Sequence, residues 1–203
     1  MMFQRFSLGD LATNSYVLFD EKAGVAALFD APAEAEKILD FLNERGLSLK
    51  YIFLTHAHFD HILALGELKA ATNAQIVIHT DEEQYLNDTK LNLSYMPLPE
   101  VKADILVSDG DVIDFSDVKI KVIHTPGHTL GGVCYMFDDT LVSGDTLFCG
   151  SIGRYDFPMG DFNTEIKSIK EKLLILPDKI KVYPGHGPST TIGNERKENP
   201  YLI

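Results

Sequence analysis

The segment that decides the fold is Tyr51-Ile52-Phe53-Leu54, followed directly by Thr55-His56-Ala57-His58-Phe59-Asp60-His61. The first four residues form a continuous apolar run with the length of a buried strand. The polar residues that follow are therefore expected at the carboxyl end of that strand. Imidazole and carboxylate groups are ligands for zinc, iron and manganese. Because His-x-His places two imidazoles on the same side of an extended backbone, and the Asp-His pair can serve a second ion, the segment indicates two adjacent metals.

Three later loops repeat this pattern, because each follows a predicted strand and joins a ligand-type residue to glycine. Glycine tolerates positive φ and lets the backbone approach closely, which a tight loop needs in order to aim a side chain into a shared cavity. The sequence therefore predicts that four loops converge on one site. The three loops are Thr125-Pro126-Gly127-His128-Thr129, Ser143-Gly144-Asp145-Thr146 and Pro184-Gly185-His186-Gly187.

The rest of the chain predicts two sheets covered by helices. Helical periodicity is expected from Pro32 to Gly46, over Ile62–Ala71, briefly after a capping box at Thr80, and over Asn163–Leu174. Residues 87–103 contain two prolines and no clear period, which predicts a flap over the site. The predicted strands are short runs bounded by turn residues: 2–8, 15–19, 25–29, 51–54, 75–78, stretches within 105–115, 118–123, 133–137, 140–142 and 180–183.

Composition limits the classes of partner. The chain has 203 residues, of which 45% are hydrophobic and 24% charged, so we expect a folded protein with a sizeable core. A formal net charge of −12 disfavours nucleic acid as the main partner, and no apolar run approaches the roughly 20 residues of a membrane-spanning helix. Two cysteines and an amino terminus without a long apolar segment predict a cytoplasmic protein. The oligomeric state is not predicted.

The four ligand-bearing segments resemble, in order and spacing, the five-motif signature of the metallo-β-lactamase superfamily. These segments are Thr55 to His61, Gly127-His128, Gly144-Asp145 and Gly185-His186. Residues 144–161 and 185–202 are similar to the compact glyoxalase II-like hydrolases. The resemblance implies an α+β fold, a four-layer αβ/βα sandwich of two mixed sheets covered by helices, with metals at one edge. We expect one such domain over residues 1–203, without the helical C-terminal domain that contributes glutathione contacts in full-length glyoxalase II enzymes.

The resemblance also implies a set of ligands. His56, His58 and His128 would hold the first metal, Asp60, His61 and His186 the second, and Asp145 would bridge them. We expect two divalent ions, zinc in the first instance, with iron or manganese as alternatives. The first set consists of three neutral imidazoles, whereas the second contains the carboxylate of Asp60. From this asymmetry we expect the first site to bind its ion more tightly than the second. Asp60 is also predicted to be catalytic, by orienting a metal-bound hydroxide.

The implied function is hydrolysis of a small-molecule thioester of the S-(hydroxyacyl)glutathione type by that hydroxide. The alternative is a persulfide dioxygenase, because such enzymes share the Gly-Arg-x-Asp-Phe stretch seen at residues 153–157 and use one iron. In that case His56, His128 and Asp145 would form a facial triad. A metal-binding module without catalysis is a third interpretation. RNA processing is disfavoured by the acidic charge, and β-lactam hydrolysis by Asp145, where one group of β-lactamases uses cysteine.

Five further residues carry weaker hypotheses. Arg154 either binds a substrate carboxylate or pairs with Asp156, and Tyr155 either reaches the substrate or packs against the core. Cys149 is expected to be a small buried hydrophobe. His79 and His124 lie outside the motifs and are expected to be structural.

Overall fold

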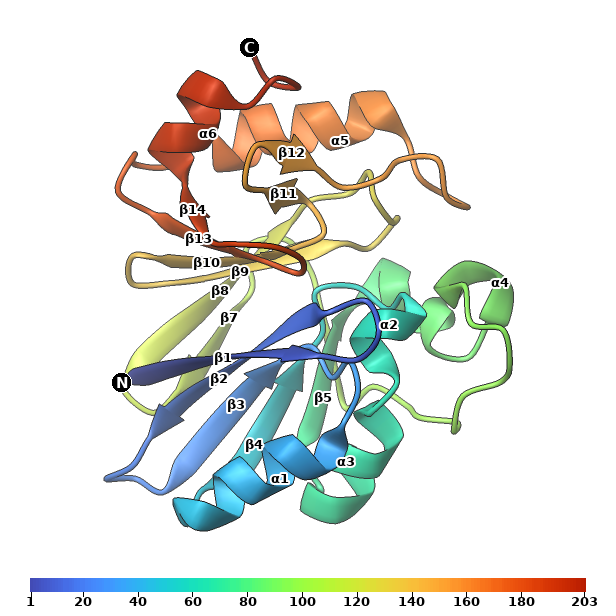
Figure 1. The fold of residues 1–203 in the computed structure, drawn as a ribbon, viewed down its shortest axis with the longest axis vertical. Coiled ribbons are helices and arrows are strands. Elements are labelled where there is room, and N and C mark those ends of the chain that lie inside the picture. The colour runs from blue at the N-terminus through green and yellow to red at the C-terminus, as the bar shows by residue number, and fades with distance from the viewer.

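The computed structural model describes residues 1–203, which form two six-stranded sheets packed face to face (Figure 1). The first sheet has the order β1-β2-β3-β4-β5-β6. Its first three strands pair antiparallel, as predicted, and the strands from β3 to β6 pair parallel. The strands are β1 (Met2–Leu8), β2 (Thr13–Asp20), β3 (Val25–Phe29), β4 (Ser48–Phe53), β5 (Gln75–His79) and β6 (Ile105–Val107).

The second sheet has the order β14-β13-β10-β9-β8-β7 and is also mixed, because only β10 and β13 pair parallel. Aromatic side chains fill the space between the sheets. The rings of Phe29 and Phe53 lie 5.7 and 5.1 Å from the ring of Tyr135. The strands are β7 (Val112–Phe115), β8 (Val118–His124), β9 (Val133–Phe137), β10 (Thr140–Gly144), β13 (Lys181–Pro184) and β14 (Thr190–Thr191), and β11 (Leu147–Phe148) pairs separately with β12 (Ser151–Ile152).

Helices cover the two outer faces (Figure 1). On the first sheet, α1 (Ala35–Glu44) and α3 (Leu65–Thr72) bury Ile38 and Leu68 in one core cluster. On the second, α5 (Phe162–Ser168), the π-helical turn η2 (Ile169–Leu173) and α6 (Ile192–Glu198) form another. The four layers confirm the predicted αβ/βα sandwich. None of the helices combines the length and apolarity that a bilayer span requires.

Several predicted elements differ in detail. The helix expected over Ile62–Ala71 is two helices, α2 (Phe59–Ile62) and α3. It breaks because Ala31 bonds to both pieces, donating from its N–H to the carbonyl of His61 and accepting from the N–H of Ala64. The turn η1 (Thr80–Leu86) is a 3₁₀ helix whose N-cap is His79 instead of Thr80. Residues 87–103 contain a short helix, α4 (Thr89–Asn92), and β14 and α6 were not predicted at all.

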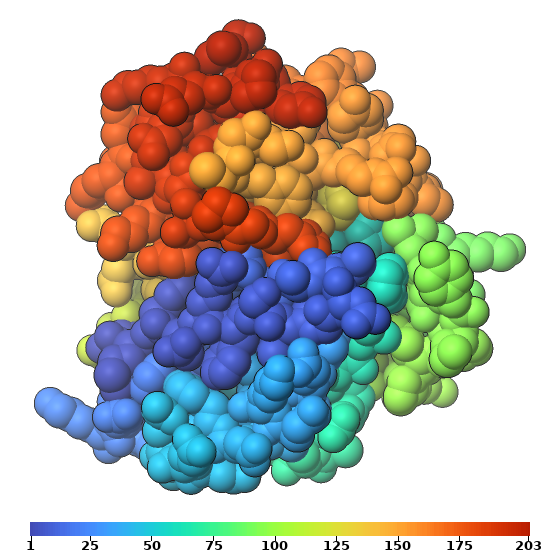
Figure 2. All heavy atoms as spheres, in the orientation of Figure 1, coloured from blue at the N-terminus to red at the C-terminus, as the bar shows by residue number.

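The two halves meet along a seam that the first two strands cover. Figure 2 shows residues near the amino terminus, in dark blue, lying between the lower half and the red C-terminal residues above them. Asn14 of β2 makes three hydrogen bonds to the chain between the end of β13 and β14. Its Nδ2 donates to the carbonyls of Pro184 and Gly187 at 2.8 and 3.0 Å, and its backbone N–H donates to the carbonyl of Gly185. The loop that carries His186 is thereby fixed to the opposite sheet.

Candidate metal centre

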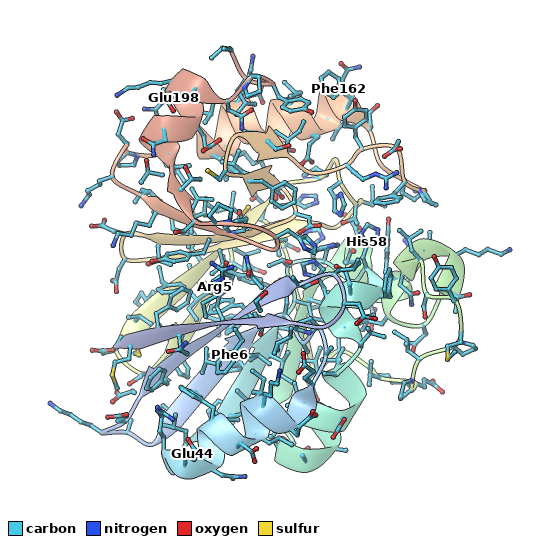
Figure 3. All side chains as sticks on the ribbon, in the orientation of Figure 1. Arg5, Phe6, Glu44, His58, Phe162 and Glu198 are labelled. Carbon is cyan, nitrogen blue, oxygen red and sulfur yellow. The ribbon has the colours of Figure 1, made fainter.

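The seven residues predicted to bind metal all lie at one end of the seam. Each follows a strand: His56, His58, Asp60 and His61 follow β4, His128 follows β8, Asp145 follows β10, and His186 follows β13. The first of these strands belongs to one sheet and the other three to the second, so both halves contribute. Figure 3 shows His58 at this edge, facing α4.

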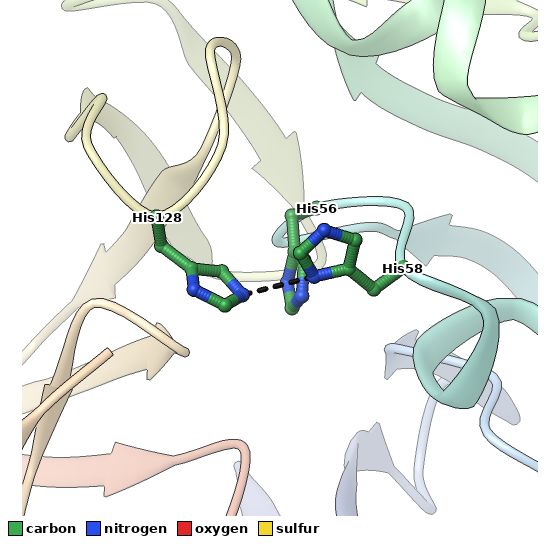
Figure 4. Close-up of side chains that lie close together, drawn as sticks. All are labelled: His56, His58 and His128. Carbon is green, nitrogen blue, oxygen red and sulfur yellow. Dashed lines mark hydrogen bonds between the residues drawn. The ribbon is translucent and has the colours of Figure 1, made fainter. Parts of the chain in front are cut away.

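Three overlapping groups of donors form within this set, each with its ligand atoms within 4.8 Å of one another. His56, His58 and His128 form the first group (Figure 4), where His58 Nδ1 lies 2.9 Å from His128 Nε2. Asp60, His61 and His186 form the second. Asp145 joins His56 and His61 in the third, and therefore lies between the other two. The structure thus brings together the residues in the groupings that the resemblance implied.

The donor atoms at the centre fit cations. His56 Nε2, His61 Nε2 and Asp145 Oδ1 are buried and have no hydrogen-bond partner. A buried polar atom left unpaired costs about 1–3 kcal/mol, so three in one place call for a group that accepts their lone pairs. Divalent metal ions do this, and imidazole with carboxylate is a donor set they prefer.

The orientation of the imidazoles is set by bonds to their other nitrogens. His61 Nδ1 lies 2.9 Å from Asp30 Oδ2, and His128 Nδ1 donates to the carbonyl of Arg154 at 2.6 Å. His56 Nδ1 lies 3.2 Å from the hydroxyl of Thr55. In each case Nε2 is left facing the centre, which is the arrangement by which outer partners fix the tautomer of a metal ligand.

Electrostatics at the centre favour neutral imidazoles in the His56, His58 and His128 group and ionised carboxylates at Asp60 and Asp145. Burial and the neighbouring histidines hold the pKa of His56 well below its usual range, and burial with His128 lowers the pKa of His58 to about 3. Burial alone would raise the pKa of Asp60, but its bond to His186 and the nearby His61 lower it to about 2. Burial opposes ionisation of Asp145 as well, and His61 outweighs it and lowers the pKa. Burial also opposes protonation of His61 and His186, but Asp145 and Asp30 raise the pKa of His61, and the bond to Asp60 raises that of His186. The centre therefore combines ionised carboxylates with neutral imidazoles at His56 and His58, and a cation bound beside Asp60 would displace protons from His61 and His186.

Three buried carboxylates that the sequence did not single out hold the ligand loops. Asp30 accepts from the N–H and the hydroxyl of Thr55, both at 2.8 Å, as well as contacting His61. Glu82 accepts from the N–H groups of Ala57 and Gly131, both at 2.9 Å, so it ties two ligand loops together. Glu165 accepts from the N–H of His128 at 2.8 Å. Their partners are 25 to 49 residues away along the chain, and no local pattern in the sequence announces such contacts.

Glycine is required where the His186 loop approaches the centre. A Cβ on Gly185 would lie 2.2 Å from Asp145 Oδ1 and 2.7 Å from His61 Cε1. No side chain fits in that space, because real Cβ contacts do not come so close. The prediction that these glycines permit close backbone approach is therefore correct at this position.

The five residues with weaker hypotheses lie outside the donor groups of the centre. Arg154 makes two bonds of 2.9 Å to the carboxylate of Asp156, which is the second of its two interpretations. Tyr155 is 40% exposed, packs on Phe162 and does not line the metal cleft, so burial against the core was wrong. Cys149 is exposed, because it lies in the β11–β12 turn, and its expected burial was wrong too. His79 and His124 stack 4.0 Å apart, outside the centre.

Above the centre lies an open cleft with a volume of about 350 Å³. It is large enough for a small organic molecule, since ligand pockets run from about 300 to 1,000 Å³. The residues that line it are Leu11, His58, Phe59, Asp60, Leu93, His128, Asp145, Phe148, Arg154, Phe157 and His186. Residues of both donor groups therefore face the cleft.

Comparison with known proteins gives a consistent result. Residues 8–186 match the model of the metallo-beta-lactamase superfamily. A hydroxyacylglutathione hydrolase, GloC of Haemophilus influenzae, is 35% identical over 93% of this chain and 92% of its own.

Two solved structures share the fold over nearly the whole chain. The BLEG-1 B3 metallo-beta-lactamase is 38% identical, with a TM-score of 0.94 and complete coverage of both chains. ETHE1 from Myxococcus xanthus is 30% identical, with a TM-score of 0.85 over 98% of this chain and 84% of its own.

Proposed function

Because the chain belongs to the metallo-β-lactamase superfamily, we propose that it is a metal-dependent hydrolase of thioesters of the S-(hydroxyacyl)glutathione type. The observation that carries the proposal is the set of two donor groups joined by Asp145 at the floor of a cleft. The similarity to GloC supports the thioester, since that relative is named for hydroxyacylglutathione hydrolysis.

In this proposal His56, His58 and His128 would hold one ion and Asp60, His61 and His186 the other, and Asp145 would serve as a ligand shared by the two groups. Divalent ions bound there supply a Lewis acid for the carbonyl and lower the pKa of a coordinated water from 15.7 to about 7. Zinc is the expected metal, with iron or manganese as alternatives, because the same donors suit all three.

The residues of the chain then position the reactants. Asp60 is ionised and its Oδ2 already accepts from the Thr13 hydroxyl at 2.9 Å, which fixes the carboxylate. Its remaining lone pairs can accept a hydrogen bond from the attacking water and so orient it.

The test is the initial rate of S-lactoylglutathione hydrolysis by metal-replete protein. Asp60→Ala is expected to lower kcat/KM by at least 100-fold, because it removes a donor and the orienting carboxylate together. Asp40→Ala, on the exposed face of α1, is the control and should leave the rate unchanged. A rate that survives both the D60A substitution and a chelator would contradict the proposal.

A persulfide dioxygenase is the second candidate, favoured by the Gly153–Phe157 stretch, whose Arg154 carbonyl bonds to His128. ETHE1 shares the fold at an identity close to that of GloC, so both candidates are carried into the experiment. Oxygen consumption on glutathione persulfide by protein with one iron per chain, without thioester hydrolysis, would favour this candidate.

A β-lactam hydrolase is the third, because of the similarity to BLEG-1. The same donors suit a strained amide carbonyl as well as a thioester. Turnover of a chromogenic cephalosporin, measured beside S-lactoylglutathione on one preparation, ranks the two by kcat/KM.

We also propose that the protein works in a reducing compartment, the cytoplasm. Cys134 is buried and Cys149 is exposed, and both are free thiols. Free exposed thiols persist where glutathione and thioredoxin keep them reduced.

A further inference from the structure

The metal centre has apolar rings on both of its sides. The ring of Phe157 lies 5.3 Å from that of His58 and 6.0 Å from that of His128. On the other side, the ring of Phe148 lies 6.2 Å from that of His186. Leu11, Phe59 and Leu93 complete the apolar lining of the cleft. A substrate bound with its carbonyl over the centre therefore meets hydrocarbon on either side.

The cleft has no free positive charge outside the histidines. Arg154 is the only lysine or arginine that lines it. Its guanidinium bonds twice to Asp156 and lies 4.1 Å above the ring of Phe157, so the charge is paired and the planar group rests on an apolar wall. An acyl group gains little here from being charged or strongly polar.

Leu93 is held in this lining by a strained backbone. Its φ is 63°, in the left-handed region that a bulky side chain rarely adopts. The neighbouring Asn92 is buried, donates to the carbonyl of Tyr85 at 2.9 Å and accepts from the N–H of Ser94 at 2.9 Å, and these bonds fix the turn around Leu93. Strain of this kind persists at functional sites where the surrounding structure imposes it.

We propose that the cleft selects 2-hydroxyacyl thioesters whose acyl group carries a large apolar substituent, and that Leu93 is a specificity-determining residue. The inference rests on the thioester hydrolysis proposed above and names the acyl group that suits it. The lining and the paired Arg154 favour an aryl or long alkyl substituent over a methyl group. One methylene in a hydrophobic pocket changes the rate by roughly 10- to 200-fold, so a phenyl ring in place of a methyl group has a measurable effect.

The experiment compares S-mandeloylglutathione with S-lactoylglutathione, because the two share the leaving group and the hydroxyl and differ only in phenyl against methyl. The wild type is expected to favour the mandeloyl substrate by at least 10-fold in kcat/KM. Leu93→Asn tests the residue, since asparagine has a similar size and adopts the left-handed conformation readily. It should lower the ratio of mandeloyl to lactoyl kcat/KM at least fivefold.

The control is Ile175→Asn, an exposed apolar residue outside the cleft, which should change neither rate. The ratio of the dissociation constants for mandelate and lactate, measured by calorimetry, should shift with L93N as the rates do. Fast lactoyl turnover with no mandeloyl preference would overturn the inference and leave the proposed function standing. A preference that L93N does not change would overturn the role of Leu93. Hydrolysis of neither thioester would overturn both proposals.

Discussion

Asp30 contacts both ends of the loop that carries His56 to His61. It receives two bonds from Thr55 at the start of the loop and contacts His61 at its end. Because an outer carboxylate fixes the tautomer and raises the basicity of a ligating histidine, its loss weakens metal binding.

We predict that Asp30→Asn lowers metal affinity by about 10- to 100-fold, as is usual for such outer partners. The amide keeps the size of the side chain but can offer a donor where His61 needs an acceptor. Competition titration against a coloured zinc chelator measures the effect. Asp40→Asn is the matched control, and an unchanged affinity in D30N would show that His61 needs no acceptor.

Glu82 makes the free energy of unfolding depend on pH. Burial raises its pKa to about 7 from an ordinary value of 4.5, even though two N–H groups stabilise the charged form. The folded protein holds this proton more tightly than the unfolded chain does, so protonation of Glu82 stabilises the fold. This contribution to the free energy of unfolding is complete below about pH 4.5 and is lost as the pH rises through about 7. The change is about 3 kcal/mol.

Glu82→Gln removes this titration. The free energy of unfolding of the wild type, minus that of E82Q, should therefore fall between pH 4.5 and 8 when both are unfolded in urea with a chelator present. A difference that stays constant over this range would mean that Glu82 does not change its protonation state there.

At the scale of elements, α6 (Ile192–Glu198) anchors the β11–β12 turn beside the cleft. Glu195 of this helix accepts from the N–H of Gly150 at 2.9 Å and from the hydroxyl of Thr190 at 2.6 Å. Its N-cap is Thr191, whose hydroxyl accepts from the N–H of Asn194 at 3.2 Å.

We predict that Thr191→Ala lowers the free energy of unfolding by about 1 kcal/mol, the usual value of an N-cap. Metal stoichiometry should stay the same, because no predicted ligand lies on α6. Thermal unfolding and metal analysis measure the two quantities. Ser189→Ala, exposed and just before β14, should change neither. Loss of metal in T191A would place α6 in the support of the centre.

The sequence predicted elements where one signal was strong. Three residues of the apolar run 51–54 lie in β4, which begins earlier, at Ser48, and ends at Phe53, and the helical spacing of Ile38 and Leu42 gives α1. It failed where distant contacts decide the backbone: Ala31 divides the helix expected after His61, and residues after His186 gave no long periodic pattern to announce α6. The predicted metal-binding residues are in motifs and lie together, whereas Asp30, Glu82 and Glu165 act through contacts that folding alone creates.

At the scale of the whole molecule, the donors are divided between the two halves, because four follow β4 in the first sheet and three follow strands of the second. Ions bound to both sets would connect the halves. A ligand that binds only the folded state, when present at a concentration of about 1,000 times its dissociation constant, stabilises that state by about 4.1 kcal/mol.

We predict that a chelator lowers the Tm by roughly 8–16 °C, given that 1 kcal/mol corresponds to about 2–4 °C in a chain of this size. Calorimetry with and without excess zinc measures this. The loss should be smaller in His186→Ala, which already lacks one donor from the second half. An identical Tm in both conditions would contradict metal-linked stability.

The division of the donors along the seam also has a consequence for turnover in the cell. The metal ions would act as a removable cross-link at one end of the seam, where, without metal, only the core between the sheets and bonds such as those of Asn14 would join the halves. Chains short of metal would expose the β4 and β13 loops to proteases, and chains loaded with metal would not. The same seven side chains that prepare the site for chemistry would thus decide which copies of the protein survive.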